Sequence, residues 1–171
     1  MIHAIAVVAI LQIFNVAHAP AGVVSRAQCE TARVFRDIGV DVTWLPSSHG
    51  ALSRHAISIV LVPDGMRSAH EPGRQVMGAA VRLSDRTRAA YVFYRPVEDA
   101  AARYAVPITL ILACAIAHEI GHVLMPDGTH SATGLMRACW DREDFARANQ
   151  GQLRFLPPQA ASIRAAISAG P

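Results

Sequence analysis

The sequence predicts an α+β domain, in which helices pack on a mixed β-sheet. The chain has 171 residues, of which 52% are hydrophobic and 17% are charged, so it can bury one sizeable core. Segments with strand and helix patterns follow one another in an irregular order, without an internal repeat. Most strand-like segments precede one long apolar helix, and a further helix lies near the C-terminus. We therefore expect a single domain over residues 1–171.

The N-terminal segment allows two interpretations. Residues 10–16 are apolar and precede a helix-like segment, which is typical of a buried strand. Residues 1–19 also end in Ala-His-Ala, as a secretory signal peptide does, but no Lys or Arg precedes the apolar run, and Gln12 and Asn15 interrupt it. We therefore prefer the first strand, and secretion remains the alternative to a cytoplasmic location. The run is too short to span a bilayer, so we expect no stable membrane insertion.

One helix and two strands follow. Apolar residues recur at helical spacing from Val23 to Ile38, and Gly39 is suited to end this helix. Residues Val40 to Leu45 alternate between apolar and polar, which predicts a half-exposed strand. Residues Ala56 to Val62 are nearly all apolar and end at Pro-Asp-Gly, which predicts a buried strand.

The central part of the chain predicts a hairpin and a short helix. Residues Arg74 to Leu83 and Ala89 to Tyr94 have the composition of strands, and the charged turn between them suggests that they pair. Pro96 begins a short helix that extends to about Tyr104.

The longest predicted element is a mostly apolar helix from Pro107 to Met125. Proline in the first turn of a helix costs no hydrogen bond, and Pro126 ends the helix. A polar loop should extend to about Ala138, and apolar spacing predicts a terminal helix from Gln159 to Ser168.

The long helix carries the spacing of a zinc site. His118 and His122 are four residues apart, so both imidazoles lie on one helix face and can bind the same Zn2+ ion at about 2.0–2.1 Å. Glu119 lies about 100° further around the helix, where its carboxylate can take a proton from a zinc-bound water. This HExxH arrangement predicts one catalytic Zn2+ ion with Glu119 as the general base. The alternative is a buried polar cluster, which would be costly without a metal.

A catalytic zinc ion requires a third protein ligand and one open coordination position. His130 follows His122 after a short loop, and imidazole is the more common zinc ligand, so we favour His130. Asp127 is nearer and is an alternative. Asp141 and Glu143 are further alternatives, because another class of HExxH enzymes takes a carboxylate ligand from a second helix at about this distance.

Residues 118–136, "HEIGHVLMPDGTHSATGLM", resemble the metzincin clan of zinc metalloproteases. The signature of that clan is an extended HExxHxxGxxH motif, followed by a turn that places a methionine beneath the metal. The matching positions are the HExGHxL residues His118, Glu119, Gly121, His122 and Leu124, the third-ligand step His130-Ser131, and the methionine turn Gly134-Leu135-Met136.

The resemblance implies a metzincin-like fold with a long active-site helix over residues 107–125, a methionine turn and a C-terminal helix. It also implies a metallopeptidase that hydrolyses peptide bonds, in which the three histidines hold Zn2+ and Glu119 acts as base and then as acid. The substrate would be a peptide or protein that binds as an added strand along a sheet edge, for which residues 76–83 are our candidate.

The sequence departs from the clan pattern between the second and third histidines. Met125 stands where the clan has a glycine, and seven residues separate the two histidines where the clan has five. Pro126 and Gly128 can supply the change of chain direction by other means. If the resemblance holds, the lengthened loop would make this chain a divergent branch of the clan.

Two other functions are compatible with these residues: a zinc-dependent hydrolase of a non-peptide substrate, and a zinc-binding protein without turnover. Three-histidine sites also serve nucleic-acid hydrolysis, but the net charge of +3 comes from scattered arginines, so we expect no nucleic-acid partner. Zinc binding alone does not require Glu119, whose presence therefore favours an enzyme.

The other reactive residue types lack the spacing of a site. The three cysteines form no CxxC pair, and we expect Cys114 and Trp140 to lie in the core. The remaining histidines are expected in surface or loop positions; they are His3, His18, His49, His55 and His70.

Overall fold

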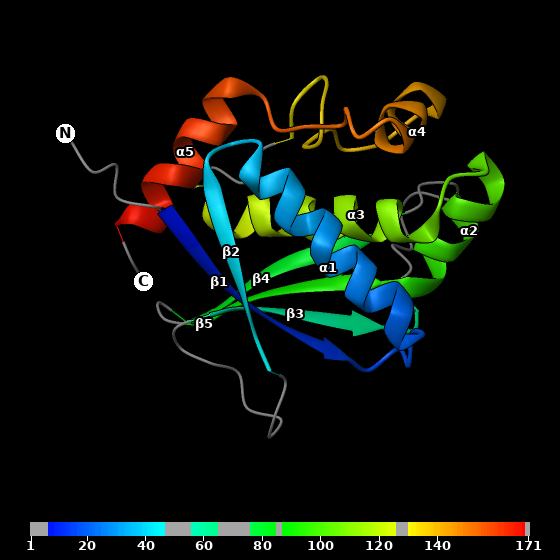
Figure 1. The fold of residues 1–171 in the computed structure, drawn as a ribbon, viewed down its shortest axis with the longest axis horizontal. Helices are drawn as coiled ribbons and strands as arrows, with labels where there is room; N and C mark the ends of the chain where they lie inside the picture. Colours follow the sequence, from blue (N-terminus) through cyan, green and yellow to red (C-terminus); the bar gives the residue numbers. More distant parts are fainter. Residues whose placement is uncertain (1–6, 47–55, 65–75, 85–86, 126–129, 170–171) are drawn as a thin grey trace.

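Five strands form one mixed sheet in the computed structural model, which describes residues 7–46, 56–64, 76–84, 87–125 and 130–169. Figure 1 shows this sheet with the helices gathered over it. The strands are β1 (Val7–Asn15), β2 (Val40–Leu45), β3 (Ile57–Val62), β4 (Gly78–Ser84) and β5 (Thr87–Phe93). The helices are α1 (Ala21–Arg36), α2 (Tyr94–Tyr104), α3 (Ile108–Leu124), α4 (Arg142–Asn149) and α5 (Pro157–Ser168).

The sheet has the strand order β2-β1-β3-β5-β4. Strand β1 pairs in parallel with β2 and with β3, and β3 pairs in parallel with β5. Strand β4 pairs with β5 in the antiparallel direction and forms an edge of the sheet. The parallel strands are joined by long connections, whereas β4 and β5 form the expected hairpin.

The core lies between the sheet and the two helices α1 and α3, which contact each other (Figure 1). Alternate residues of β1 point into this core, because successive side chains of a strand lie on opposite faces; they are Ala9, Leu11 and Ile13. Helix α3 is buried along most of its length and contacts β4 and β5. The polar residues His118 and Glu119 of α3 are therefore buried.

The structure confirms the predicted fold class and the order of the predicted elements. Strand β2 has the predicted bounds, and β1 covers most of the segment for which a strand was preferred over an export signal. One element was not predicted: α4 follows the loop after α3. Among the described residues, no helix combines the length and the apolar character that a membrane span requires.

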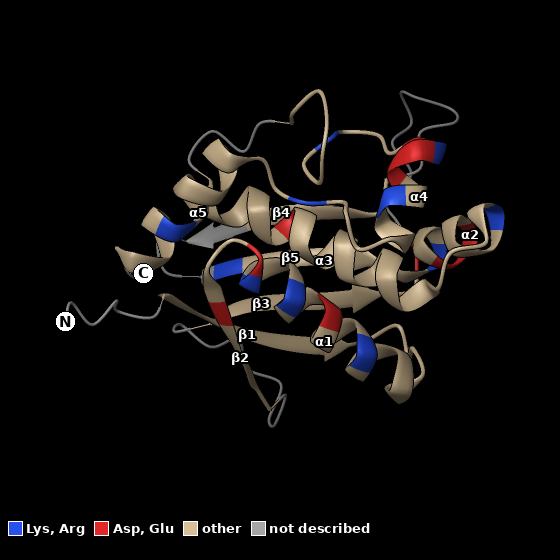
Figure 2. Ribbon diagram, turned by 45° about the horizontal axis from the view of Figure 1, so that its top comes forward, with Lys and Arg blue, Asp and Glu red and all other residues tan. Residues whose placement is uncertain are grey.

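Charged residues are mixed on the helices. Figure 2 shows basic and acidic residues of α1, α2 and α4 close to one another along each helix. Several of them form ion pairs within one helix, such as Arg33 with Glu30 and Arg147 with Glu143. Such exposed pairs stabilise a fold by only about 0–1 kcal/mol each, so they indicate solvated helix surfaces.

Candidate metal centre

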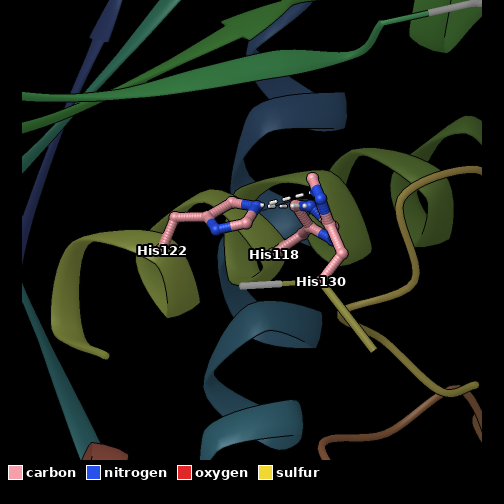
Figure 3. Close-up of side chains that lie close together, drawn as sticks. All are labelled: His118, His122 and His130. Atoms are coloured by element: carbon pink, nitrogen blue, oxygen red, sulfur yellow. Dashed lines mark hydrogen bonds between the residues drawn. The ribbon is translucent and has the colours of Figure 1, made fainter. Parts of the chain in front are cut away.

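Three histidines come together at the C-terminal half of α3. The Nε2 atoms of His118 and His122, one turn apart on the helix, are 2.9 Å apart. His130 lies beyond the helix, and its Nε2 atom is 3.1 Å from that of His122. All three ligand atoms lie within 4.8 Å of one another, and Figure 3 shows the three rings pointing toward one another. His118 is buried, His122 is partly buried and His130 is exposed, so the cluster opens toward solvent.

A backbone carbonyl fixes the protonation of His118. The Nδ1 atom of His118 lies 2.7 Å from the carbonyl oxygen of Leu135. A carbonyl can only accept, so Nδ1 carries the proton, and Nε2 of the neutral ring keeps its lone pair for the cluster. Burial lowers the pKa of His118 to about 4, and this effect outweighs the opposing effect of the hydrogen bond to Leu135. His118 is therefore neutral at pH 7 and able to bind a metal.

The donor set fits a zinc ion. The Nε2 atom of His122 faces two other Nε2 atoms, yet one ring nitrogen carries at most one proton and can donate to only one of them. A cation at the centre would accept all three lone pairs. Nitrogens that bind one tetrahedral Zn2+ at 2.0–2.1 Å are about 3.4 Å apart, which is near the two separations observed here.

Glu119 follows His118 on α3 and is 6% exposed. Burial raises the pKa of its carboxyl group to about 8. The side chain lies against Gly78 at the start of β4, because a Cβ atom built on Gly78 would be 2.5 Å from Cγ of Glu119. The carboxyl group thus lies between α3 and the edge strand β4.

The raised pKa of Glu119 predicts a pH dependence of the metal-free protein. Between about pH 4.5 and pH 8 the folded state keeps a proton that the unfolded state releases, so stability falls as pH rises through this window. The lowered pKa of His118 affects stability only below about pH 6.5, where it makes stability rise with pH. From pH 6.5 to 8, the Glu119→Gln variant should therefore avoid a loss of about 1–2 kcal/mol that the unmodified protein shows. Urea unfolding at several pH values in the presence of a chelator measures the free energy of unfolding of both proteins. The same pH dependence in both would contradict a raised pKa of Glu119.

The segment after His130 folds into a tight turn beneath α3. The N–H of Ser131 donates to the carbonyl of Met136 at 2.9 Å, and Gly134 adopts a left-handed φ of 78°. Met136 is fully buried, and its Sδ atom is 2.6 Å from the place that a Cβ atom on Gly121 would occupy. Only glycine at position 121 therefore lets Met136 pack this closely against the helix turn that carries the histidines.

Trp140 contributes to the surroundings of His118 as well as to the core. Its Nε1–H donates to the carbonyl oxygen of Leu135 at 3.1 Å, the same oxygen that accepts from His118. Its ring lies edge-on to His118 with centroids 5.8 Å apart, and edge-on to Phe145 at 6.1 Å. No sequence pattern indicates the role of Leu135, because any residue can supply a backbone carbonyl.

The structure does not bring the alternative carboxylates to the histidines. Asp141 caps α4 by accepting hydrogen bonds from the N–H groups of Glu143 and Asp144, and it also pairs with Arg137. Glu143 pairs with Arg147 at 2.6 Å. Asp127 lies outside the described residues. The group of potential metal ligands within the described ranges consists of the three histidines.

Two further residues that the sequence analysis considered, Cys114 and His18, lie within the described residues. Cys114 is buried in the core, as predicted, and burial raises the pKa of its thiol to about 12. His18 is exposed, as expected. The remaining histidines fall outside the described residues; they are His3, His49, His55 and His70.

Comparison with known proteins gives a match of fold. No protein-family model matches the sequence, and no curated protein matches it. The structure is similar to the crystal structure of metalloproteinase-II from Bacteroides fragilis, with a TM-score of 0.51 and 14% sequence identity. The match covers 93% of this chain and 53% of that chain, so the protein spans about half the length of this metalloproteinase. The chain therefore has a metalloproteinase-like fold.

Proposed function

We propose that the protein is a zinc-dependent metallopeptidase of the metzincin type. His118, His122 and His130 would hold one Zn2+ ion, and Glu119 would act as general base and then as general acid. The observation that carries this proposal is the convergence of three Nε2 atoms beside a buried glutamate. The metalloproteinase-like fold supports it.

When bound, the zinc ion would polarise the peptide carbonyl and make water more acidic. The chain itself supplies the other parts of the reaction. Glu119 would take a proton from the attacking water and return it to the leaving amine, which breaks the peptide bond. A carboxyl group whose pKa lies near neutrality is suited to both transfers, and burial raises that of Glu119 in this direction. His118 is kept in the required tautomer by the carbonyl of Leu135.

The outer edge of β4 is the proposed binding site for the substrate peptide. The N–H of Phe93 donates to the carbonyl of Met77 at 2.8 Å. Gly78 is the next residue and pairs with Val92, so the alternation of an antiparallel ladder turns its N–H and C=O groups away from β5. No described strand pairs with this side of β4. A peptide that adds as a strand there would run beside Glu119.

The turn from Gly134 to Met136 is the proposed methionine turn. Its supporting features are the buried Met136 and its close packing against Gly121. The same turn supplies the Leu135 carbonyl that binds His118. The turn would hold the His118 ring in the orientation that metal binding requires.

Removal of the metal tests the proposed function. Treatment with 1,10-phenanthroline should abolish cleavage of denatured casein by the purified protein, and added Zn2+ should restore it, because the proposed reaction requires the metal to polarise the peptide carbonyl. A non-chelating phenanthroline isomer is the control for nonspecific inhibition. Cleavage that continues in the chelated protein would contradict a zinc mechanism.

A further inference from the structure

We propose that Gly78 is a positioning residue for Glu119, an inference that rests on the proposed function. A Cβ atom at position 78 would be 2.5 Å from Cγ, 2.6 Å from Oε1 and 2.7 Å from Cδ of Glu119. Contacts this short do not occur between non-bonded carbon and oxygen atoms, so any side chain at this position would displace the carboxyl group. The missing Cβ atom thus provides the space in which the base lies.

Backbone conformation does not explain the glycine. Gly78 lies in β4, and it is absent from the described glycines with positive φ, which are Gly39, Gly134 and Gly151. An alanine could adopt the extended backbone of this strand. Glycine is therefore required at this position because of the close approach of Glu119, not because of a turn.

The helix cannot move away from a larger residue at position 78. Glu119 is flanked on α3 by His118 and Ile120, and Ile120 is fully buried. The helix also contacts α1, α2 and β5. The glutamate side chain, by contrast, can rotate about its own bonds. A methyl group on residue 78 would therefore move the carboxyl group and leave the helix with its histidines in place.

Gly78 also faces the proposed substrate. Its backbone N–H and C=O groups point to the open edge of β4, while the position that a Cβ atom would occupy is filled by the side chain of Glu119. One residue would thus contact both the main chain of the bound peptide and the base that acts on it. Gly78 would thus set the position of the base relative to the backbone of the bound peptide.

The variant Gly78→Ala tests this role. We expect it to bind one zinc ion per chain with an unchanged Kd, because Glu119 is not a ligand. Its kcat for peptide cleavage should fall about a hundredfold, the loss that a displacement of about 1 Å causes, with little change in KM. The matched control is Gly22→Ala on α1, where the added Cβ atom meets only the end of Arg26 at 3.6 Å; its kcat should be unchanged. Unchanged kcat in zinc-loaded Gly78→Ala would overturn the proposal.

A double-mutant cycle tests the contact without any activity assay. Gly78→Ala should lower the Tm of the protein that carries Glu119, and it should not lower the Tm of the Glu119→Ala variant, where the space is free. An equal decrease in both backgrounds would overturn the proposal. If the unmodified protein cleaves no peptide, the proposed function fails, and the cycle still decides whether Gly78 positions Glu119.

Discussion

Glu119→Gln is expected to keep one zinc ion per chain and to lower kcat/KM for peptide cleavage by about 10²–10⁴. Glutamine has nearly the same size and fits the space beside Gly78, but it cannot take a proton from water. The loss should therefore fall on the chemical step and leave metal binding intact. Zinc content by mass spectrometry and initial rates on a fluorogenic peptide library measure the two properties in the same preparation.

Two outcomes would remove Glu119 from this role. If Glu119→Gln lost its zinc, the carboxylate would be holding the metal site together. If the rate were unchanged, another group would be the base. The conservative control is Asp144→Asn. Asp144 is a buried carboxylate on α4 that pairs with Arg137 at 2.6 Å and is not part of the three-histidine group. It should leave the dependence of rate on zinc unchanged.

His130→Ala is expected to weaken zinc binding by more than about a hundredfold. Loss of a residue that only hydrogen-bonds to a ligand weakens binding by up to about a hundredfold, and loss of a ligand itself should cost more. His130 lies outside the helix, is exposed, and contributes one of the three converging Nε2 atoms. Its removal leaves two helical histidines, which are too few for a catalytic zinc site. Competition with a fluorescent zinc chelator measures the Kd, and peptide cleavage should be lost at limiting zinc.

Asp141→Ala is the matched test of the alternative ligand. Asp141 caps α4 and pairs with Arg137, so its loss should lower the free energy of unfolding and leave the zinc Kd unchanged. If Asp141→Ala weakened zinc binding and His130→Ala did not, the third ligand would be a carboxylate.

Much of the fold follows from local patterns in the sequence. Strand β2 alternates polar and apolar residues, and β3 is apolar except for Ser58, so period and composition locate both strands. Pro107 precedes helix α3 and Pro126 follows it; proline is tolerated at the start of a helix and ends one for local steric reasons. These signals depend on a few neighbouring residues, and they appear in the structure where they were expected.

Helix α4 was missed although its signal is present. Asp141 and Asp144 form a capping box at the start of α4, with each side chain bonded to the backbone of the other residue. The pattern Asp-x-x-Asp marks a helix start when an amphipathic stretch follows it. The helix has only eight residues, so its periodicity is short and easily taken for a loop.

The contacts that shape the candidate site depend on the three-dimensional arrangement of distant segments. The spacing of His118 and His122 is a property of one helix, and it could be read directly from the sequence. The approach of Gly78 to Glu119 joins a strand edge to a helix, and the support of His118 comes from the backbone of Leu135. Neither contact has a signature in residue types, so sequence patterns could not predict it.

X-ray absorption at the zinc edge tests the three-histidine site most directly. The zinc-loaded protein should show three imidazole nitrogens at about 2.0–2.1 Å, together with one oxygen ligand from water. A ligand shell with sulfur, or with two imidazoles and a carboxylate, would contradict the proposed assignment of His118, His122 and His130.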